Sequence, residues 1–224
     1  WLPAERLSVD LAFNHESDSY GAAMEVVAAA LGESTAHATS NGAQAKQFVG
    51  IWLDAGTGLL LDIAANPDGT VSASYDGGTE VLSIGSDGIA RGLDMTLTAV
   101  DGGLGIHRPF DGIQSHATPI RAQVGTETST DTAGTYRSDE VGSELEIICA
   151  GGCWFAGFRG FLGTGPMMPL SPVGPDLWRM SCLRSLDAPA PGDWTVQIAR
   201  LASGAISGVT IGCWLARNVA FRRA

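Results

Sequence analysis

The sequence predicts a mainly β protein, in which two related small antiparallel β domains follow the last strand and helix of an α/β layer. Three observations lead to this fold class. Residues 1–31 carry one strand pattern and one helix pattern. After them, short apolar runs alternate with Asp-Gly and Gly-Gly turns, which is typical of antiparallel sandwiches or barrels. The pattern that opens at Gly50 also recurs at Gly134.

The N-terminal segment predicts a strand followed by a helix. Residues 5–14 alternate, with one apolar side made of Leu7, Val9, Leu11 and Phe13. A helical stripe follows, and Gly32 stands where a helix C′ glycine belongs; the stripe is Met24, Val27, Ala28 and Leu31. One strand and one helix have nothing here to bury their apolar faces against. We therefore expect the rest of this layer upstream of Trp1, in a protein that is processed, nicked or truncated.

Two polar segments divide the remaining chain. Residues 32–47 are small and polar and predict a linker before a first β domain at 48–121. Residues 122–131 predict a second linker, before a second β domain at 132–224. Hairpin turns are expected at the Asp-Gly pairs that begin at Asp68, Asp76, Asp87 and Asp101.

The two β domains open alike. Val49-Gly-Ile-Trp52 and Ala133-Gly-Thr-Tyr136 are each followed by an apolar run, a turn, and an aromatic residue, Tyr75 or Phe158. Two copies of one small domain are the economical explanation, and each copy suits a small closed barrel.

The composition limits the classes of partner that the protein is expected to bind. The formal net charge of −11 disfavours nucleic acid and anionic membranes. No run is apolar and long enough to span a membrane, and no signal peptide is visible. Cys149 and Cys153 have a spacing that weakly suggests a metal or redox site, but the apolar runs around the cysteines favour buried free thiols. Such thiols suit a reducing compartment, so we expect a cytoplasmic protein.

No complete catalytic centre is visible in the chain. Ser-x-x-Lys is absent, because Lys46 is the only lysine and Ala43 stands three residues before it; Gly-x-Ser-x-Gly is absent too. The four histidines lack metal-ligand spacing and are His15, His37, His107 and His116. We therefore expect no catalytic residue, no metal and no cofactor within these residues.

One loop stands out between two strand-like runs. The segment from Arg184 to Gly192 contains Pro189 and Pro191, whose fixed φ angles make a loop stiff. Asp187 is expected near its tip. Either this carboxylate enters a neighbouring cleft and pairs with a cation, or the loop is an ordinary rigid hairpin loop with a solvated aspartate. Physics alone favours the ordinary loop.

A set of short motifs runs across nearly the whole chain: Glu5-Arg-Leu-Ser8, Trp52-Leu-Asp54, Thr57-Gly-Leu59, Gly134-Thr-Tyr-Arg-Ser-Asp-Glu140, Gly160-Phe-Leu-Gly163, Met167-Met-Pro-Leu170, Val173-Gly174, Arg184-Ser-Leu-Asp-Ala-Pro189, Pro191-Gly-Asp-Trp194 and Gly212-Cys-Trp-Leu-Ala-Arg217. In consistent order, these motifs resemble the C-terminal region of the bacterial D-aminopeptidases, a family of penicillin-recognising serine hydrolases. Departures lie in the linker after Gly32 and in the Ala-Pro-Ala-Pro part of the loop.

The resemblance implies an architecture and a missing partner. Residues 1–31 would be the last strand and closing helix of a β-lactamase-like catalytic domain. Residues 48–121 and 132–224 would be eight-stranded antiparallel, lipocalin-like barrels. The Ser-x-x-Lys, Tyr-x-Asn and His-Gly-Gly motifs would lie in an N-terminal catalytic half, and the complete enzyme is expected to be a homodimer.

The resemblance also implies a role for the stiff loop. Arg184, Ser185, Leu186, Ala188 and Pro189 would reach into the catalytic cleft. Asp187 would recognise the free α-ammonium group of a peptide or amide with a D-amino terminus, which is cleaved through an acyl-enzyme. Two alternatives remain open: a lipocalin-like module that binds a small ligand or a regulatory partner, and an esterase or amidase of the same superfamily.

Overall fold

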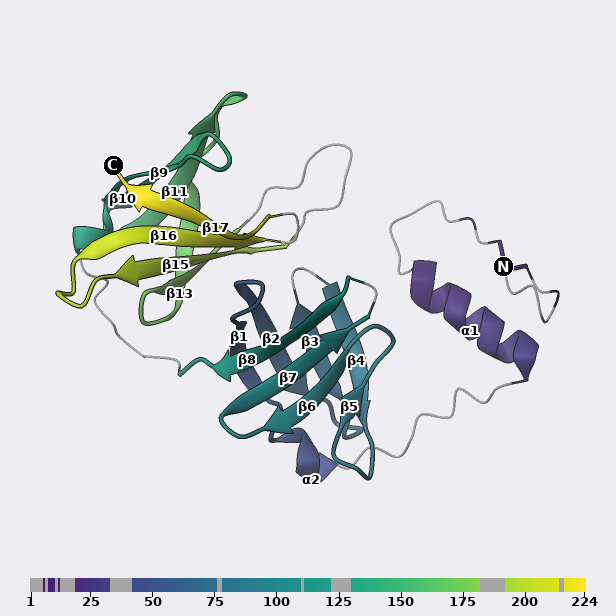
Figure 1. Cartoon of the computed structure of the whole chain (residues 1–224). Helices are drawn as coiled ribbons and strands as arrows, with labels where there is room; N and C mark the ends of the chain where they lie inside the picture. The colour runs from purple at the N-terminus through teal and green to yellow at the C-terminus, as the bar shows by residue number, and fades with distance from the viewer. Residues whose placement is uncertain are drawn as a thin grey trace.

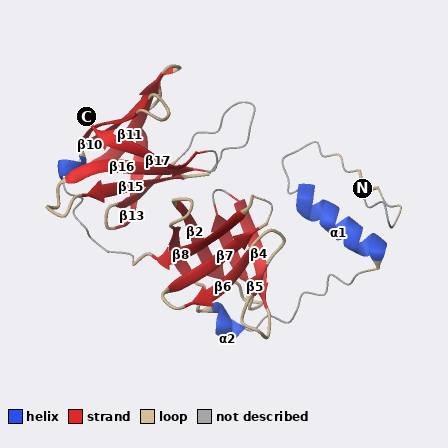
Figure 2. Ribbon diagram, viewed as in Figure 1, coloured by secondary structure: helices blue, strands red, loops and turns tan. Residues whose placement is uncertain are grey.

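Strands dominate the computed structural model (Figures 1 and 2). It describes residues 6, 8–10, 12, 19–32, 42–75, 78–109, 111–121, 130–181, 192–213 and 216–224. The helical elements in these ranges are α1 (Ser19–Leu31), α2 (Gly42–Ala45) and the 3₁₀ turn η1 (Thr130–Thr132). None of the described helices has the length and apolar character needed to cross a bilayer.

The first barrel is a closed antiparallel meander in which each strand pairs with the next and β8 pairs back to β1. Asp-Gly turns occur as predicted at Asp68, Asp87 and Asp101, each with its glycine at positive φ, while Asp76 and Gly77 lie outside the described residues. The strands are β1 (Gly50–Asp54), β2 (Leu59–Ala65), β3 (Val71–Tyr75), β4 (Gly78–Ile84), β5 (Ala90–Arg91), β6 (Thr96–Val100), β7 (Gly103–Arg108) and β8 (Ile113–Pro119).

The second barrel repeats this meander with eight strands, and the two-stranded tip formed by β11 and β12 extends beyond it. The prediction of two antiparallel eight-stranded barrels is therefore confirmed. The strands are β9 (Gly134–Ser138), β10 (Ser143–Ala150), β11 (Cys153–Gly160), β12 (Gly163–Thr164), β13 (Met168–Gly174), β14 (Leu177–Met180), β15 (Trp194–Arg200), β16 (Ile206–Cys213) and β17 (Ala216–Arg223).

The internal repeat is present at the level of single residues. Trp52 pairs with Leu61 across β1 and β2, and Tyr136 pairs with Leu145 across β9 and β10. Trp52 Nε1 donates to the carbonyl oxygen of Phe48 at 2.8 Å, and Tyr136 Oη donates to the carbonyl oxygen of Thr132 at 2.7 Å. In both copies an aromatic side chain of the first strand thus fastens the entering chain four residues upstream.

Each barrel has its own packed interior. The buried side chains of the first barrel form one contiguous cluster, which includes Phe48 and Tyr75, and those of the second form another, which includes Tyr136 and Phe221. Inward-facing residues alternate with outward-facing ones, as in β3 and β9, because side chains of a strand point to opposite faces. Interiors filled this way resemble small barrels whose side chains occupy the lumen.

The N-terminal expectations have mixed outcomes. The helix forms, and Gly32 follows it with φ +72° and donates to the carbonyl oxygen of Ala29, as a C′ glycine does. Residues 8–10 and 12, the described part of the predicted strand with Arg6, are in no strand; a strand needs a partner to pair with. Within the predicted linker at 32–47, α2 forms and Ala45 is buried in the core of the first barrel.

The prediction of buried thiols is right for Cys213 and wrong for Cys149 and Cys153. Cys149 and Cys153 are exposed and free, whereas Cys213 is buried at the end of β16; Cys182 lies outside the described residues. Both exposed thiols flank the Gly151–Gly152 turn, where β10 and β11 extend past the packed interior. The apolar run before Cys149 fills the core, but the strand continues beyond the core.

A buried carboxylate organises the β1–β2 turn. Asp54, fully buried at the end of β1, accepts hydrogen bonds from the backbone N–H of Gly56 and from the hydroxyls of Thr57, Tyr75 and Ser115, at 2.8–2.9 Å. These donors replace the water that a buried carboxylate loses. Burial raises the pKa of the Tyr75 phenol well above its ordinary value, so this hydroxyl stays protonated and able to donate.

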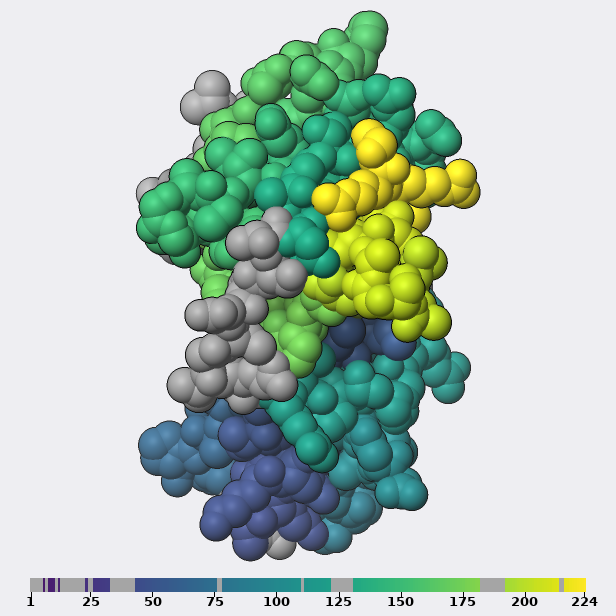
Figure 3. Space-filling model, turned by 90° about the vertical axis from the view of Figure 1, so that its left-hand side faces the viewer, coloured from purple at the N-terminus to yellow at the C-terminus, as the bar shows by residue number. Residues whose placement is uncertain are grey.

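The turn held by Asp54 lies against the second barrel (Figures 1 and 3). Asn218 Nδ2 of β17 donates to the carbonyl oxygen of Gly56 at 3.0 Å. A Cβ on Gly212 of β16 would clash with the carbonyl oxygen of Gly58, so the two backbones touch. Asp111 links the barrels as well, because its carboxylate lies 3.4 Å from Arg108 and 3.5 Å from Arg217. We call this set of contacts the seam.

Asp54→Asn tests the buried carboxylate. The amide offers one acceptor oxygen where four donors now converge, so we expect the free energy of unfolding to fall by about 2 kcal/mol. Urea unfolding followed by tryptophan fluorescence measures the change. Asp101→Asn, in an exposed turn, is the control and is expected to change stability by less than about 0.5 kcal/mol. Equal effects of the two substitutions would contradict the assigned role of Asp54.

The raised pKa of Tyr75 predicts that the protein is less stable in alkali. Its folded-state pKa is raised, so above pH 10, the ordinary tyrosine value, the unfolded chain loses this proton while the folded chain keeps it. The free energy of unfolding should therefore fall as pH rises above that value. Tyr75→Phe should make this fall shallower, which urea midpoints measured on both sides of pH 10 would reveal; an unchanged slope would refute the assignment.

Gly212→Ala tests the close approach at the seam. The added methyl group meets the backbone of Gly58, which cannot rotate away, so we expect a loss of about 1–3 kcal/mol in unfolding free energy. Gly105→Ala is the matched strand control, since its Cβ would lie 3.7 Å from the nearest atom, the carbonyl oxygen of Thr98. If both variants unfold like the parent protein, the barrels do not touch at this point.

Candidate functional site

The predicted active-site loop leaves the second barrel between β14 and β15. Met180, the last residue of β14, pairs with Trp194, the first residue of β15, and this pair forms the neck of the loop. Residues 182–191 lie outside the described part of the chain. The predicted site residues all fall in that range, so they remain predictions: Arg184, Ser185, Leu186, Asp187, Ala188 and Pro189.

An arginine beside the neck contacts both the first barrel and Asp193, the residue before β15. Arg179 Nη2 lies 2.6 Å from the Asp62 carboxylate of β2, and its Nε lies 3.9 Å from the carboxylate of Asp193, just after the loop. The Arg179 side chain is 28% exposed, so solvent screens the pair and its contribution to stability is modest. The two contacts matter for geometry, because the guanidinium group of Arg179 links the first barrel to the residue that precedes β15.

The neck opens onto a cavity of about 300 Å³ that both barrels line. The first barrel contributes residues of β2, β3 and β4, and the second contributes Arg179, Gly192 and Asp193. The lining residues are Leu59, Leu60, Asp62, Ser74, Thr79, Arg179, Gly192 and Asp193. Two carboxylates and one guanidinium can hold a polar segment in place, and the hydroxyls of Ser74 and Thr79 hydrogen-bond to each other at 2.7 Å.

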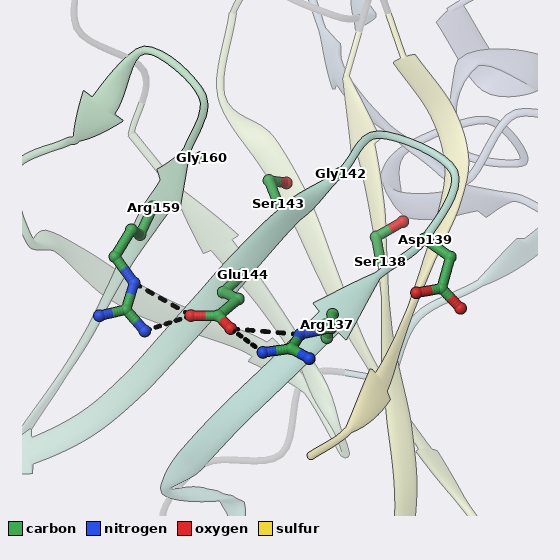
Figure 4. Close-up of a pocket in the computed structure, with 8 residues that line it drawn as sticks. All are labelled: Arg137, Ser138, Asp139, Gly142, Ser143, Glu144, Arg159 and Gly160. Atoms are coloured by element: carbon green, nitrogen blue, oxygen red, sulfur yellow. Dashed lines mark hydrogen bonds and ion pairs between the residues drawn. The ribbon is translucent and has the colours of Figure 1, made fainter.

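A second cavity, of about 520 Å³, lies at the surface of the second barrel beside the β9–β10 turn (Figure 4). Glu144 lies between Arg137 and Arg159 on the neighbouring strands and forms ion pairs with both. Hydrogen bonds from both guanidinium groups hold the pKa of Glu144 below its ordinary value. A carboxylate stabilised this way is a poor general base.

This ion-pair cluster was not predicted from the sequence. Arg137 and Arg159 lie 7 and 15 residues from Glu144 along the chain, and the three meet because the strand register places Glu144 opposite both arginines. Charges of opposite sign at facing positions of consecutive predicted strands were the available signal. Reading that signal requires the register, which the sequence pattern did not provide.

The histidines and acidic residues that the structure describes do not gather into a metal site. His107 and His116 are exposed on the adjacent strands β7 and β8, and His15 and His37 lie outside the described ranges. Among the described residues, no three His, Cys, Asp or Glu side chains gather where they could hold a metal ion. What this part of the chain provides is a platform that fixes the two ends of a loop.

Comparison with known proteins identifies the family of this chain. A family model described as D-aminopeptidase, domain B, matches residues 41–222. A D-aminopeptidase of Cereibacter sphaeroides is 40% identical over 219 residues, and one of Brucella ovis is 38% identical over 219 residues. Each match covers 98% of this chain but only 41% of the relative. Because the similarity runs through both barrels and the segment between β14 and β15, this chain belongs to the D-aminopeptidase family.

Proposed function

We propose that this chain is the C-terminal part of a D-stereospecific aminopeptidase and that it selects substrates for a catalytic part outside it. The complete enzyme, meaning this chain together with that catalytic part, would release N-terminal D-residues such as D-alanine from peptides or amides. The observation that carries the proposal is the identity of 40% to a D-aminopeptidase over 98% of this chain, including the loop segment.

The catalytic part would supply the chemistry. Under this proposal it carries a serine nucleophile in Ser-x-x-Lys, with Tyr and His motifs, and it forms an acyl-enzyme with the substrate. The share of the relatives that this chain leaves uncovered is large enough for such a domain. Residues 1–31 would complete that domain, residues 48–121 and 132–224 would be the barrels, and the complete enzyme would be a cytoplasmic homodimer.

Asp187 would select the substrate by its amino terminus. In a cleft closed to water, a carboxylate and an α-ammonium group form a charge-assisted hydrogen bond, which is stronger than a neutral one. A blocked amino terminus lacks the positive charge and leaves the carboxylate without a partner, which strongly disfavours binding. The loop would also narrow the cleft through Arg184, Ser185, Leu186, Ala188 and Pro189.

The barrels would give the loop its direction. Arg179 binds Asp62 at the neck, and the seam joins the barrels through Asn218 and the Gly58–Gly212 contact. A recognition group works best when rigid elements hold it near its productive position. The first barrel then acts as a support that keeps the second barrel, and with it Asp187, at a set angle to the catalytic part.

The two alternatives differ in their support. Packed clusters of buried side chains fill the interiors of both barrels, so nothing in the described chain favours a lipocalin-like ligand. An esterase or amidase of the same superfamily would keep the serine chemistry, and substrate assays on the complete enzyme separate it from an aminopeptidase.

Asp187→Asn in the complete enzyme tests the proposal. Loss of a buried charge pair should lower kcat/KM for a D-alanine amide with a free amine by about a hundredfold. Hydrolysis of the N-acetylated amide should hardly change, so the preference for free amino termini should collapse. Steady-state kinetics on both substrates measure this preference.

Glu140→Gln is the matched control, because it removes one exposed negative charge from the same end of the second barrel. It should leave the ratio of the two kcat/KM values as in the parent enzyme. An Asp187→Asn enzyme that keeps the parent ratio would refute the role of this residue, and a complete enzyme without activity on D-amino amides would refute the proposed function.

A further inference from the structure

The tip of the β11–β12 hairpin is the most exposed apolar feature of the described chain. Phe161 is 100% exposed and Leu162 is 97% exposed. Val141, at the tip of the neighbouring β9–β10 turn, is 49% exposed and lines with them a hollow of about 440 Å³. We call Val141, Phe161 and Leu162 the hairpin patch. Single exposed apolar residues are common, but adjacent large ones on a projecting tip mark interaction sites.

Backbone pairing in the hairpin keeps these side chains exposed to solvent. Arg159 pairs with Thr164 and Gly160 with Gly163 across β11 and β12. The N–H of Gly165 donates to the carbonyl oxygen of Phe158 at 2.8 Å, which closes the base of the hairpin. The tip extends beyond the barrel (Figure 1), so the barrel core does not cover it.

The ion-pair cluster braces this hairpin from the side. Arg159, directly before the tip, donates from Nε to Glu144 at 3.0 Å, and Arg137 donates to the other carboxylate oxygen at 3.2 Å (Figure 4). Three neighbouring strands are thus tied together at the point where the hairpin leaves the barrel. Solvent screens these exposed pairs, so the backbone pairing of β11 with β12 contributes most of the order. A tip with an ordered backbone loses less conformational entropy when it binds, which favours a docking role.

Topology places the hairpin at the same end of the second barrel as the predicted active-site loop. Successive strands of an antiparallel meander run in opposite directions, so the β9–β10, β11–β13 and β14–β15 connections all lie at one end. The first barrel spans the corresponding positions with residues 76–77 and 92–95, whereas the second uses 161–167 and 181–193. Two connections are therefore longer at this end of the second copy than at the corresponding end of the first.

We infer that the hairpin patch docks on the catalytic part of the complete enzyme. This chain covers 41% of its relatives, so most of each relative is outside it and available as the surface that covers the patch. The inference rests on the proposed function, in which the neighbouring loop addresses that same part. The hairpin would act as a second, apolar contact that fixes the second barrel on the catalytic part while the loop reads the substrate.

Hydroxyl-radical footprinting with mass spectrometry tests the docking on native side chains. Oxidation of Phe161 and Leu162 should be fast in the 224-residue chain, once circular dichroism has established that it is folded, and several-fold slower in the complete enzyme. Leu201 is the matched control, because it is 57% exposed in a turn at the opposite end of the barrel. Its oxidation should be equal in both.

Each outcome decides the inference. Equal oxidation of Phe161 and Leu162 in the two proteins overturns it. Protection that appears in the 224-residue chain as its concentration rises also overturns it, because the patch then binds a second copy. Protection in a complete enzyme that does not hydrolyse D-amino amides supports the docking and refutes the proposed function. A complete enzyme that hydrolyses D-amino amides but leaves Phe161 and Leu162 unprotected supports the proposed function and overturns the docking.

A variant separates docking from catalysis. Phe161→Ser with Leu162→Ser alters side chains that already face solvent in this chain, so the barrel should fold as before. In the complete enzyme the double variant should expose the facing surface of the catalytic part to radicals, whereas Leu201→Ser should not. An unchanged footprint of the catalytic part would contradict the inference.

Discussion

The contact between the backbones of Gly58 and Gly212 is the constraint on which the arrangement of this chain depends. Two closed barrels offer each other only convex surfaces, and convex surfaces touch over small areas. Here one turn of the first barrel meets a strand of the second backbone to backbone at Gly58 and Gly212, and the Asn218 side chain donates a hydrogen bond to the same turn. The turn keeps its shape because Asp54, from inside its own barrel, holds Gly56 and Thr57. A polar group in one core thus fixes the geometry between two domains.

The two copies show how a duplicated barrel divides its roles. They share the opening glycine, the inward aromatic and the register of the first hairpin. They differ four residues after that glycine, where the first copy has the buried Asp54 and the second has the buried Ser138. The copy with the carboxylate builds the turn of the seam, and the other copy carries the long connections. Support and recognition are thereby separated between two copies of one fold.

Much of the fold was predictable because local sequence patterns determine it. Alternation within strands, Asp-Gly turns and the recurrence at Gly134 predict two antiparallel barrels without any knowledge of long-range contacts. The burial of Cys149 was predicted wrongly, since an apolar run does not reveal where a strand passes the end of the core. The Glu144 cluster and the seam were not predicted, because they depend on register and on docking between domains. The role of Asp187 came from resemblance alone and remains a prediction.

Closure of both meanders also limits how anything else can bind. In the described chain every strand except β12 has hydrogen-bonded neighbours on both sides, although some pairings are short, such as the two residue pairs that join β4 to β5. A partner therefore finds only short stretches of backbone edge on which to add a strand, the route by which many sheets recruit peptides or aggregate. The connections at the barrel ends are less constrained by this pairing. In this scaffold new specificity can arise by lengthening a loop, while the hydrogen-bonded wall behind it stays the same.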